Sequence, residues 1–358
     1  MGTPGLVAEP ELVTPGWLTD VLRQAGAITD GTAVASFRST PIGTGQVGSN
    51  VRYALDYDGP AGPATVVCKF GSREPASAAA AVGLHLYETE VAFYLDLAST
   101  VDVSRPHCYF AVVEPGTADV VLVMEDLSPA EQGDQIEGCT VAQAELAVDE
   151  AARLHGPRWA DPTLAELGWL NRDDGLGALL PMAWDSFVER YQSALDPVTL
   201  ETGAELVGLL AATSVRHRPV RTAIHGDFRL DNMLFGTSAG GRPLTVVDWQ
   251  TVQLGVGAQD VAYFLGNAFE PGLRRSCERA LLARYHRALV DDYAVVDYPF
   301  AQCWSEYVTF AHASLVMAIW ASMLVGRTDR GDAMFLAMAS RSAQMAADLD
   351  EVSAIRSN

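Results

Sequence analysis

The segment HGDFRLDN, which ends at Asn232, combines residue types that could carry out phosphoryl transfer. This reaction needs a carboxylate that orients the proton of an acceptor hydroxyl, and it needs oxygen ligands for magnesium. Asp227 suits the first role and Asn232 suits the second. His225 could instead bind a metal together with Asp227, but no third ligand lies close in the sequence. We therefore interpret His225 as a structural residue that braces the loop.

A second carboxylate, Asp248, follows in the segment VVDWQ and ends the apolar run Leu244–Val247. An aspartate at the end of a short strand can point toward the same site and bind a magnesium ion that bridges phosphates. Asp248 by itself would be an ordinary turn carboxylate. The joint spacing with Asp227 and Asn232 favours a functional role for all three residues.

Lysine is used once in this chain. Of the 24 lysines and arginines, only Lys69 is a lysine, and it lies on the third strand that the sequence predicts. A codon bias toward arginine would explain the composition. However, a compact ammonium group and a guanidinium group are not equivalent beside a phosphate, so the position of Lys69 predicts a role in phosphate binding.

The elements that must position these residues change in type along the chain. Up to Met124 the pattern of apolar residues predicts strands and helices. After Met124 it predicts mostly helices, with short strand-like runs around the two motifs. This order indicates an α+β chain with a sheet lobe over residues 1–124 and a larger helical lobe over residues 125–358. The predicted strands are Ala33–Ser39, Ser49–Tyr57, Ala64–Phe70, Cys108–Val113 and Val120–Met124, and the principal helices are Pro15–Gly26, Ser77–Ala98 and Thr140–His155, followed by a helical tail from Val261 to about Ile355.

Composition limits the classes of protein that this chain can be. Its 358 residues are 49% hydrophobic, which is enough for a sizeable core. The net charge of −21 argues against wholesale nucleic-acid binding. An acidic balance could favour a cationic substrate, although a solubilising surface explains it as well. The five cysteines show no CxxC spacing and the N-terminal segment does not resemble a signal peptide, so we expect a cytoplasmic location.

The apolar segment Tyr307–Gly326 contains no charged residue over 20 positions, and this length could span a bilayer. It also contains His312 and several hydroxyl side chains, and the sequence offers no second candidate span. We predict a buried helix in the helical lobe and no membrane span. A membrane-anchored protein is the alternative.

The two motifs resemble the catalytic and metal-binding motifs of the aminoglycoside phosphotransferase and choline kinase-like superfamily. The segments Met124–Gln135 (MEDLSPAEQGDQ) and Ala152–Trp159 (ARLHGPRW) make the chain most similar to the bacterial, ecdysteroid-kinase-like branch. The resemblance covers roughly Pro41–Leu265. It implies a bilobal protein-kinase-like fold with a small antiparallel-sheet N-terminal lobe that carries one helix, and a larger helical C-terminal lobe.

The resemblance also implies roles for individual residues. Asp227 would be the catalytic base, and Asn232 and Asp248 would hold Mg²⁺. Arg229 corresponds to a position that is often a lysine in protein kinases and touches the transferred phosphate there, although a surface arginine is the alternative. Asp260 would brace the catalytic loop.

A kinase of this type pairs a lysine on its third strand with the nucleotide phosphates and with a glutamate on the following helix. Lys69 matches the lysine, and Glu90 matches the glutamate better than Glu88 does. A solvent-facing charge is the alternative for Glu90.

The segment Gly43–Gly48 fits the pattern GxGxxG between two predicted strands. It does not open a helix, which disfavours a dinucleotide-binding βαβ unit, and it suits a hairpin that covers phosphates. We also expect the connector Met124–Leu127 to offer backbone groups to the adenine, with a simple loop as the alternative. The predicted nucleotide contacts are therefore Gly43, Gly45, Gly48, Ser49, Met124, Glu125 and Leu127, besides Lys69 and Glu90.

We therefore expect a phosphotransferase that uses ATP, with GTP not excluded, and Mg²⁺ to phosphorylate a hydroxyl of a small molecule, as a monomer or homodimer. The short interval between Asp248 and Asp260 leaves no room for a peptide-docking activation loop, so a protein substrate is disfavoured. One alternative is a catalytically silent, kinase-like nucleotide-binding protein. Another is a kinase for hydrophobic alcohols or hydroxyacyl groups and not for amino sugars.

Overall fold

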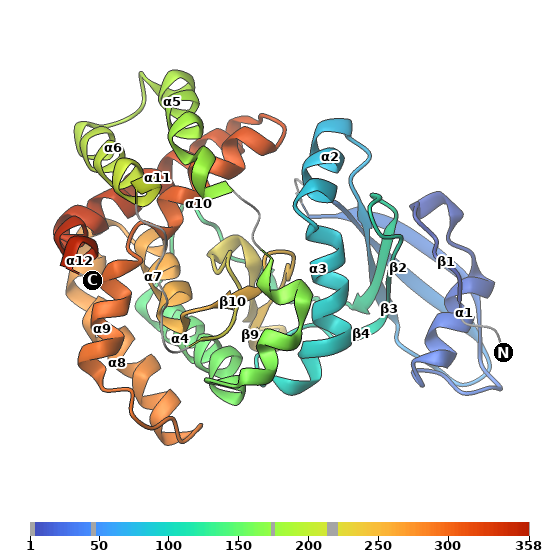
Figure 1. The fold of residues 1–358 in the computed structure, drawn as a ribbon. Helices are drawn as coiled ribbons and strands as arrows, with labels where there is room; N and C mark the ends of the chain where they lie inside the picture. Colours follow the sequence, from blue (N-terminus) through green and yellow to red (C-terminus); the bar gives the residue numbers. More distant parts are fainter. Residues whose placement is uncertain (1–3, 44–47, 173–175, 213–220, 358) are drawn as a thin grey trace. The chain divides into compact units, whose positions relative to one another are not determined.

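The computed structural model describes residues 4–43, 48–172, 176–212 and 221–357. The chain divides into two compact units, one formed by Met1–Ser99 with Arg105–Ser128 and the other by Thr100–Ser104 with Pro129–Asn358 (Figure 1). The first unit thus continues to Ser128, whereas the sequence predicts a boundary at Met124. The segment Thr100–Ser104, which the sequence assigns to the first lobe, belongs to the second unit.

The first unit is built on one antiparallel sheet with the strand order β1-β2-β3-β5-β4. This confirms the small antiparallel sheet that the sequence predicts. The elements of the unit are α1 (Pro15–Gln24), β1 (Ala33–Ile42), β2 (Gly48–Asp58), β3 (Thr65–Gly71), α2 (Pro75–Gly83), α3 (Leu86–Ala92), β4 (Cys108–Val113) and β5 (Val120–Glu125).

Each face of this sheet belongs to a different core cluster. One cluster combines α1 with the side chains of Cys68 and Phe70 on β3, and the other combines α3 with Leu122 and Met124 on β5. Successive side chains of a strand point to opposite faces. Lys69, between Cys68 and Phe70, therefore lies on the α3 face of the sheet.

The helix that the sequence predicts over Ser77–Ala98 is divided in the structure. Helix α2 ends at Gly83, His85 adopts a left-handed backbone with φ of 57°, and α3 starts one residue later. A π-helical turn, Phe93–Leu97, then extends α3. The prediction of one continuous helix is therefore wrong, because apolar spacing continues across a break that only the backbone conformation of His85 creates.

The second unit contains two small sheets among helices. Strand β7 pairs with β10, and β8 lies between β6 and β9, all antiparallel. The strands are β6 (Glu131–Gln132), β7 (Thr222–Ile224), β8 (Met233–Thr237), β9 (Gly240–Val246) and β10 (Gln253–Gly255), and the helices are α4 (Val141–His155), α5 (Leu180–Tyr191), α6 (Pro197–Ala212), α7 (Gly257–Ala268), α8 (Pro271–Asp291), α9 (Phe300–Thr309), α10 (Ala313–Leu324), α11 (Asp329–Asp348) and α12 (Glu351–Ser357).

Two predictions about these helices can be compared with the structure. Helix α4 matches the predicted helix Thr140–His155, and Thr140 is its N-cap and forms a capping box with Gln143. The apolar segment expected to form one buried helix instead forms α9 and α10. Phe300–Leu324 is long and apolar enough to cross a membrane by length and composition, and an 18-residue window in it has a mean hydropathy of 1.5. However, 67% of that window is buried inside the protein. A core helix of a soluble protein passes the same test, so the segment is weak support for a membrane span.

Candidate active site

The loop between β7 and β8, which we call the catalytic loop after its predicted role, carries the segment HGDFRLDN. Strand β7 ends at Ile224, and a short 3-10 turn over Leu230–Asn232 leads into β8. The Val247 N–H donates to the carbonyl of Asn232 at 2.9 Å, where β9 has just ended. This backbone bond brings Asn232 next to the strand end that carries Asp248, as the two motifs predict.

The Asp227 carboxylate accepts hydrogen bonds on both of its oxygens. The Nε of Arg229 lies 2.9 and 3.0 Å from Oδ1 and Oδ2. The Tyr263 hydroxyl donates to Oδ1 at 2.6 Å, and the Nδ2 of Asn232 donates to Oδ2 at 2.9 Å. Three donors therefore determine the orientation of the predicted catalytic base.

These contacts also set the ionisation of the site. Burial would raise the pKa of the Asp227 carboxyl, but the charge of Arg229 and the hydrogen bond from Tyr263 outweigh it, so the pKa lies below its ordinary value. Burial, and then the charge of Asp227, raise the pKa of Tyr263 well above its ordinary value. Asp227 is thus an anion that faces a neutral phenol and a guanidinium group.

The backbone of this loop is held by Asp260 at the start of α7. Its carboxylate accepts the N–H groups of His225 and Gly226 at 2.6 and 3.0 Å, and the ring Nε2 of His155 lies 3.2 Å away. The predicted bracing role of Asp260 is confirmed. Gly226 has a φ of 81°, and a Cβ there would lie 2.5 Å from the carbonyl oxygen of Thr251, so this position needs glycine.

His225 joins the two motifs, as its predicted structural role requires. Its Nε2 lies 3.1 Å from the Val247 carbonyl oxygen, which can only accept, so Nε2 carries the proton. The Nδ1 atom then accepts the N–H of Asp227 at 3.3 Å. The fully buried ring of Trp249 packs on His225 with the ring centroids 4.8 Å apart.

Asp248 has a left-handed backbone conformation that its sequence did not predict. Its φ is 67°, a region that residues other than glycine rarely adopt. Such outliers cost free energy and concentrate at functional sites. The conformation is therefore an independent indication that the position of this carboxylate matters.

The first unit contains the predicted pair of Lys69 and Glu90. The Nζ of Lys69 lies 2.8 and 2.7 Å from the two Glu90 oxygens. The Glu90 side chain is 2% exposed and the Lys69 side chain is 12% exposed. Glu88 instead contacts His85 and the backbone N–H of Gly116. The structure thus pairs Lys69 with Glu90, which α3 presents to the same face of the sheet.

The glycine-rich segment is described only at its ends. Gly43 has a φ of 74°, and a Cβ at Gly48 would lie 2.7 Å from the carbonyl oxygen of Phe70 on β3. The positive φ of Gly43 and the close contact between Gly48 and β3 therefore explain both glycines without a nucleotide. Ser49 is exposed on β2, and Gly45 lies outside the described residues. Phosphate contacts from this segment stay a prediction.

The connector Met124–Leu127 offers fewer groups to an adenine than the sequence predicts. Met124 and Glu125 belong to β5, and the Met124 side chain is buried in the α3 core cluster. The Glu125 N–H donates to the carbonyl of His107 at 2.8 Å, so this donor is already used within the first unit. Leu127 lies beyond the strand, and an adenine contact there stays a prediction.

Sequence reasoning missed several residues that hold the loop. Asp231 accepts from Arg330 of α11 at 3.0 and 3.1 Å, from the Gln135 N–H at 2.9 Å and from Arg229 at 3.2 Å. The Gln135 side chain in turn accepts the Leu230 N–H at 3.0 Å. Gln135 lies in a segment that carried the family resemblance, but Arg330 had no local signal.

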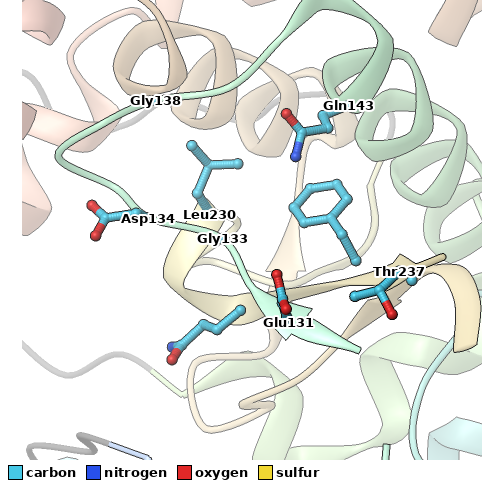
Figure 2. A pocket seen from close by; sticks show the side chains of 10 residues that line it. Glu131, Gly133, Asp134, Gly138, Gln143, Leu230 and Thr237 are labelled. Carbon is cyan, nitrogen blue, oxygen red and sulfur yellow. The ribbon is translucent and has the colours of Figure 1, made fainter. Parts of the chain in front are cut away.

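A pocket of about 360 Å³ lies beside the catalytic loop in the second unit. Glu131 and Thr237 line it from the strands and Gln143 lines it from α4, while Leu230 belongs to the loop (Figure 2). Asp227 is not among its lining residues. The pocket is therefore adjacent to the candidate site but separate from the carboxylate that would do the chemistry.

Comparison with known proteins finds a family model and solved structures that are similar to this chain. A family model described as a phosphotransferase enzyme family matches residues 43–298. An ethanolamine kinase from Plasmodium vivax is 9% identical with a TM-score of 0.51, over 90% of this chain and 86% of that one. A Ralstonia eutropha JMP134 protein, provisionally named an aminoglycoside phosphotransferase, is 16% identical with a TM-score of 0.52, over 92% and 97% of the two chains. These likenesses show the bilobal kinase-like fold. No curated protein sequence matches.

Proposed function

Because this chain belongs to the phosphotransferase enzyme family, within the aminoglycoside phosphotransferase and choline kinase-like superfamily, we propose that it transfers the γ-phosphate of ATP to a hydroxyl of a small molecule. The observation that carries the proposal is the Asp227 carboxylate, which three donors orient beside the Asn232–Val247 backbone bond. A carboxylate held in this way can accept a hydrogen bond from the acceptor hydroxyl and take its proton as the phosphate bond forms.

The side chains of Asn232 and Asp248 fit a magnesium ion. Both offer oxygen atoms, which Mg²⁺ prefers, and one or two protein ligands besides the phosphates are usual for this ion. Asn232 uses its Nδ2 on Asp227, which leaves its Oδ1 for a cation. No group of three or more His, Cys, Asp or Glu that could hold a metal occurs among the residues the structure describes, which agrees with a site completed by a nucleotide. Magnesium would neutralise charge on the phosphates.

We assign the binding of the nucleotide phosphates to the first unit. The Lys69 ammonium group, held by the buried Glu90 carboxylate, is the expected partner of the α- and β-phosphates. ATP is the proposed donor, with GTP as the alternative. A cytoplasmic location agrees with the five free cysteines.

A hydrophobic alcohol or hydroxyacyl compound is the second candidate acceptor, in place of an amino sugar. Asp231, the other carboxylate on the catalytic loop, is held by the guanidinium groups of both Arg229 and Arg330. Its charge is therefore already compensated, and the two arginines would repel a substrate ammonium group. The thioether of Met334 also lies 3.0 Å from Arg229 Nη1. Arg229 itself is the proposed contact for the transferred phosphate.

The deciding experiment is a phosphorylation screen over amino sugars, choline-like amines, hydroxyacyl thioesters and sterols, with ADP release as the readout. Asp227→Asn should lower kcat by about 100-fold or more, since it removes the base. Lys69→Met should raise the KM for ATP and weaken ADP binding in calorimetry. Asp56→Asn, which alters an exposed ion pair of the first unit, is the control and should change neither.

The same screen separates the proposal from a catalytically silent protein. Tight binding of Mg²⁺ and ADP without turnover on any acceptor, or turnover that persists in Asp227→Asn, would refute phosphotransfer by this site. Turnover confined to sterols or hydroxyacyl thioesters would select the second acceptor class.

A further inference from the structure

Helix α7 is buried along almost its whole length, yet three large polar side chains lie along one side of it. Asp260, Tyr263 and Asn267 are spaced by three and four residues, which places them on one face. All three hold the catalytic segment. Asp260 accepts the loop N–H groups and Tyr263 donates to the Asp227 carboxylate. The Asn267 Oδ1 accepts from Gln135 Nε2 at 2.5 Å, and Gln135 in turn accepts the Leu230 N–H.

Tyr263 differs from the other two because it contacts the predicted base itself. Its side chain is almost fully buried, and its hydroxyl lies 2.6 Å from Asp227 Oδ1. A carboxylate can only accept, so the phenol donates this bond. Hydrogen bonds to a charged acceptor are short and strong, so this one restricts the rotation of the carboxylate.

Two donors, Tyr263 and Asn232, each bond one oxygen of Asp227, whereas the third donor, Arg229, is shared between both oxygens. Tyr263 holds Oδ1 from a buried helix, and Asn232 holds Oδ2 from the turn before β8. Arg229 spans both oxygens with one N–H group, at 2.9 and 3.0 Å, and each half of a shared bond is weaker. If Arg229 moves away, the other two donors still hold one oxygen each.

We propose that Tyr263 is a positioning residue that, with Asn232, keeps the Asp227 carboxylate oriented while the acceptor hydroxyl takes the place of the Arg229 Nε. This inference rests on the proposed function and deepens it. The acceptor hydroxyl approaches from the side that Arg229 now occupies. Its proton passes to Asp227 as the new oxygen–phosphorus bond forms and the bond to the leaving ADP breaks.

Tyr263→Phe removes only the hydroxyl and keeps the ring in the core. With Mg²⁺ and ATP as the probe, and water as the acceptor, kcat for ADP release should fall about 10- to 100-fold, as expected for a misplaced catalytic group. The KM for ATP and the Kd for ADP should stay within about twofold of the parent protein, since no nucleotide contact is removed.

Tyr307→Phe is the matched control, because Tyr307 is equally buried in the second unit and donates to the Glu278 carboxylate at 3.0 Å. It should leave kcat unchanged. Equal losses of kcat in both variants, or a loss expressed only in KM, would overturn the positioning role.

A crystal structure of Tyr263→Phe tests the inference separately from turnover. In the Arg229→Ala background, where Arg229 no longer holds the carboxylate, Asp227 should keep its orientation with Tyr263 present and should rotate or become disordered with Tyr263→Phe. An unchanged orientation in the double variant would overturn the inference even if the protein is a kinase. If the parent protein releases no ADP with water as the acceptor, the acceptor screen decides the proposed function and the orientation of Asp227 decides the inference.

Discussion

The contact between Asp260 and the catalytic loop leads to a quantitative prediction for Asp260→Asn. The carboxylate accepts the N–H groups of His225 and Gly226 and faces the Nε2 of His155, all in the buried interior. An asparagine keeps one acceptor oxygen, and its NH₂ group then faces a backbone donor. One charge-assisted bond is lost and one buried N–H is left unsatisfied, which together cost about 3 kcal/mol.

This free energy corresponds to a fall of about 6–12 °C in the melting temperature for a unit of this size. The measurement is calorimetric unfolding, together with ADP release to follow the loop. Activity should fall with stability, because Asp227 follows the two braced residues directly.

Asp161→Asn is the control, because Asp161 accepts the Thr163 N–H at 2.8 Å in a partly exposed cap where asparagine serves nearly as well. The ion pair of Asp161 with Arg158 is also partly exposed, so its loss should cost less than about 1 kcal/mol. The melting temperature of this variant should change by less than about 2 °C, since the two residues are equivalent caps. The reasoning fails if Asp260→Asn melts within the same range, or if both variants lose equal stability.

Two further results are expected. Asp248→Gly should be about 1 kcal/mol more stable to urea than Asp248→Ala, because only glycine relieves the left-handed backbone, and neither variant should show Mg²⁺-dependent turnover. Equal stabilities would remove the argument from strain. The folded protein should also lose stability above about pH 10. Burial is the main cause that raises the pKa values of Tyr263, Tyr285 and Tyr307, so these side chains stay neutral in the folded protein while they ionise in the unfolded chain. Three protons correspond to about 4 kcal/mol lost per pH unit, measured by urea unfolding; a flat profile from about pH 9 to 11 would contradict it.

Much of the candidate site could be predicted because its chemistry is local in the chain. Asp227 and Asn232 lie in or next to one loop, and Asp248 follows the strand pair β8–β9. The pairing of Lys69 with Glu90 is more distant in the chain, and it was predictable only because the resemblance to kinases implies a lysine on the third strand that pairs with a glutamate on the following helix.

The break at His85 and the division of the apolar tail into α9 and α10 escaped prediction. Apolar spacing records which side of an element is buried, but it does not record where the backbone turns. A single residue with positive φ, or three residues in a turn at Phe310–His312, leaves that spacing almost unchanged. Boundaries of this kind are set by packing.

The sequence by itself determined which residues are candidates for the reactive groups and the broad order of strands and helices, because spacing and periodicity are properties of neighbouring residues. Only the tertiary structure decided which side chains hold Asp227. Tyr263 lies 36 residues along the chain from Asp227, and Gln135 lies 95 residues from the Leu230 N–H that it accepts. No local pattern encodes these contacts, because they form only when α7 and the segment that carries Gln135 pack against this loop and satisfy its polar groups.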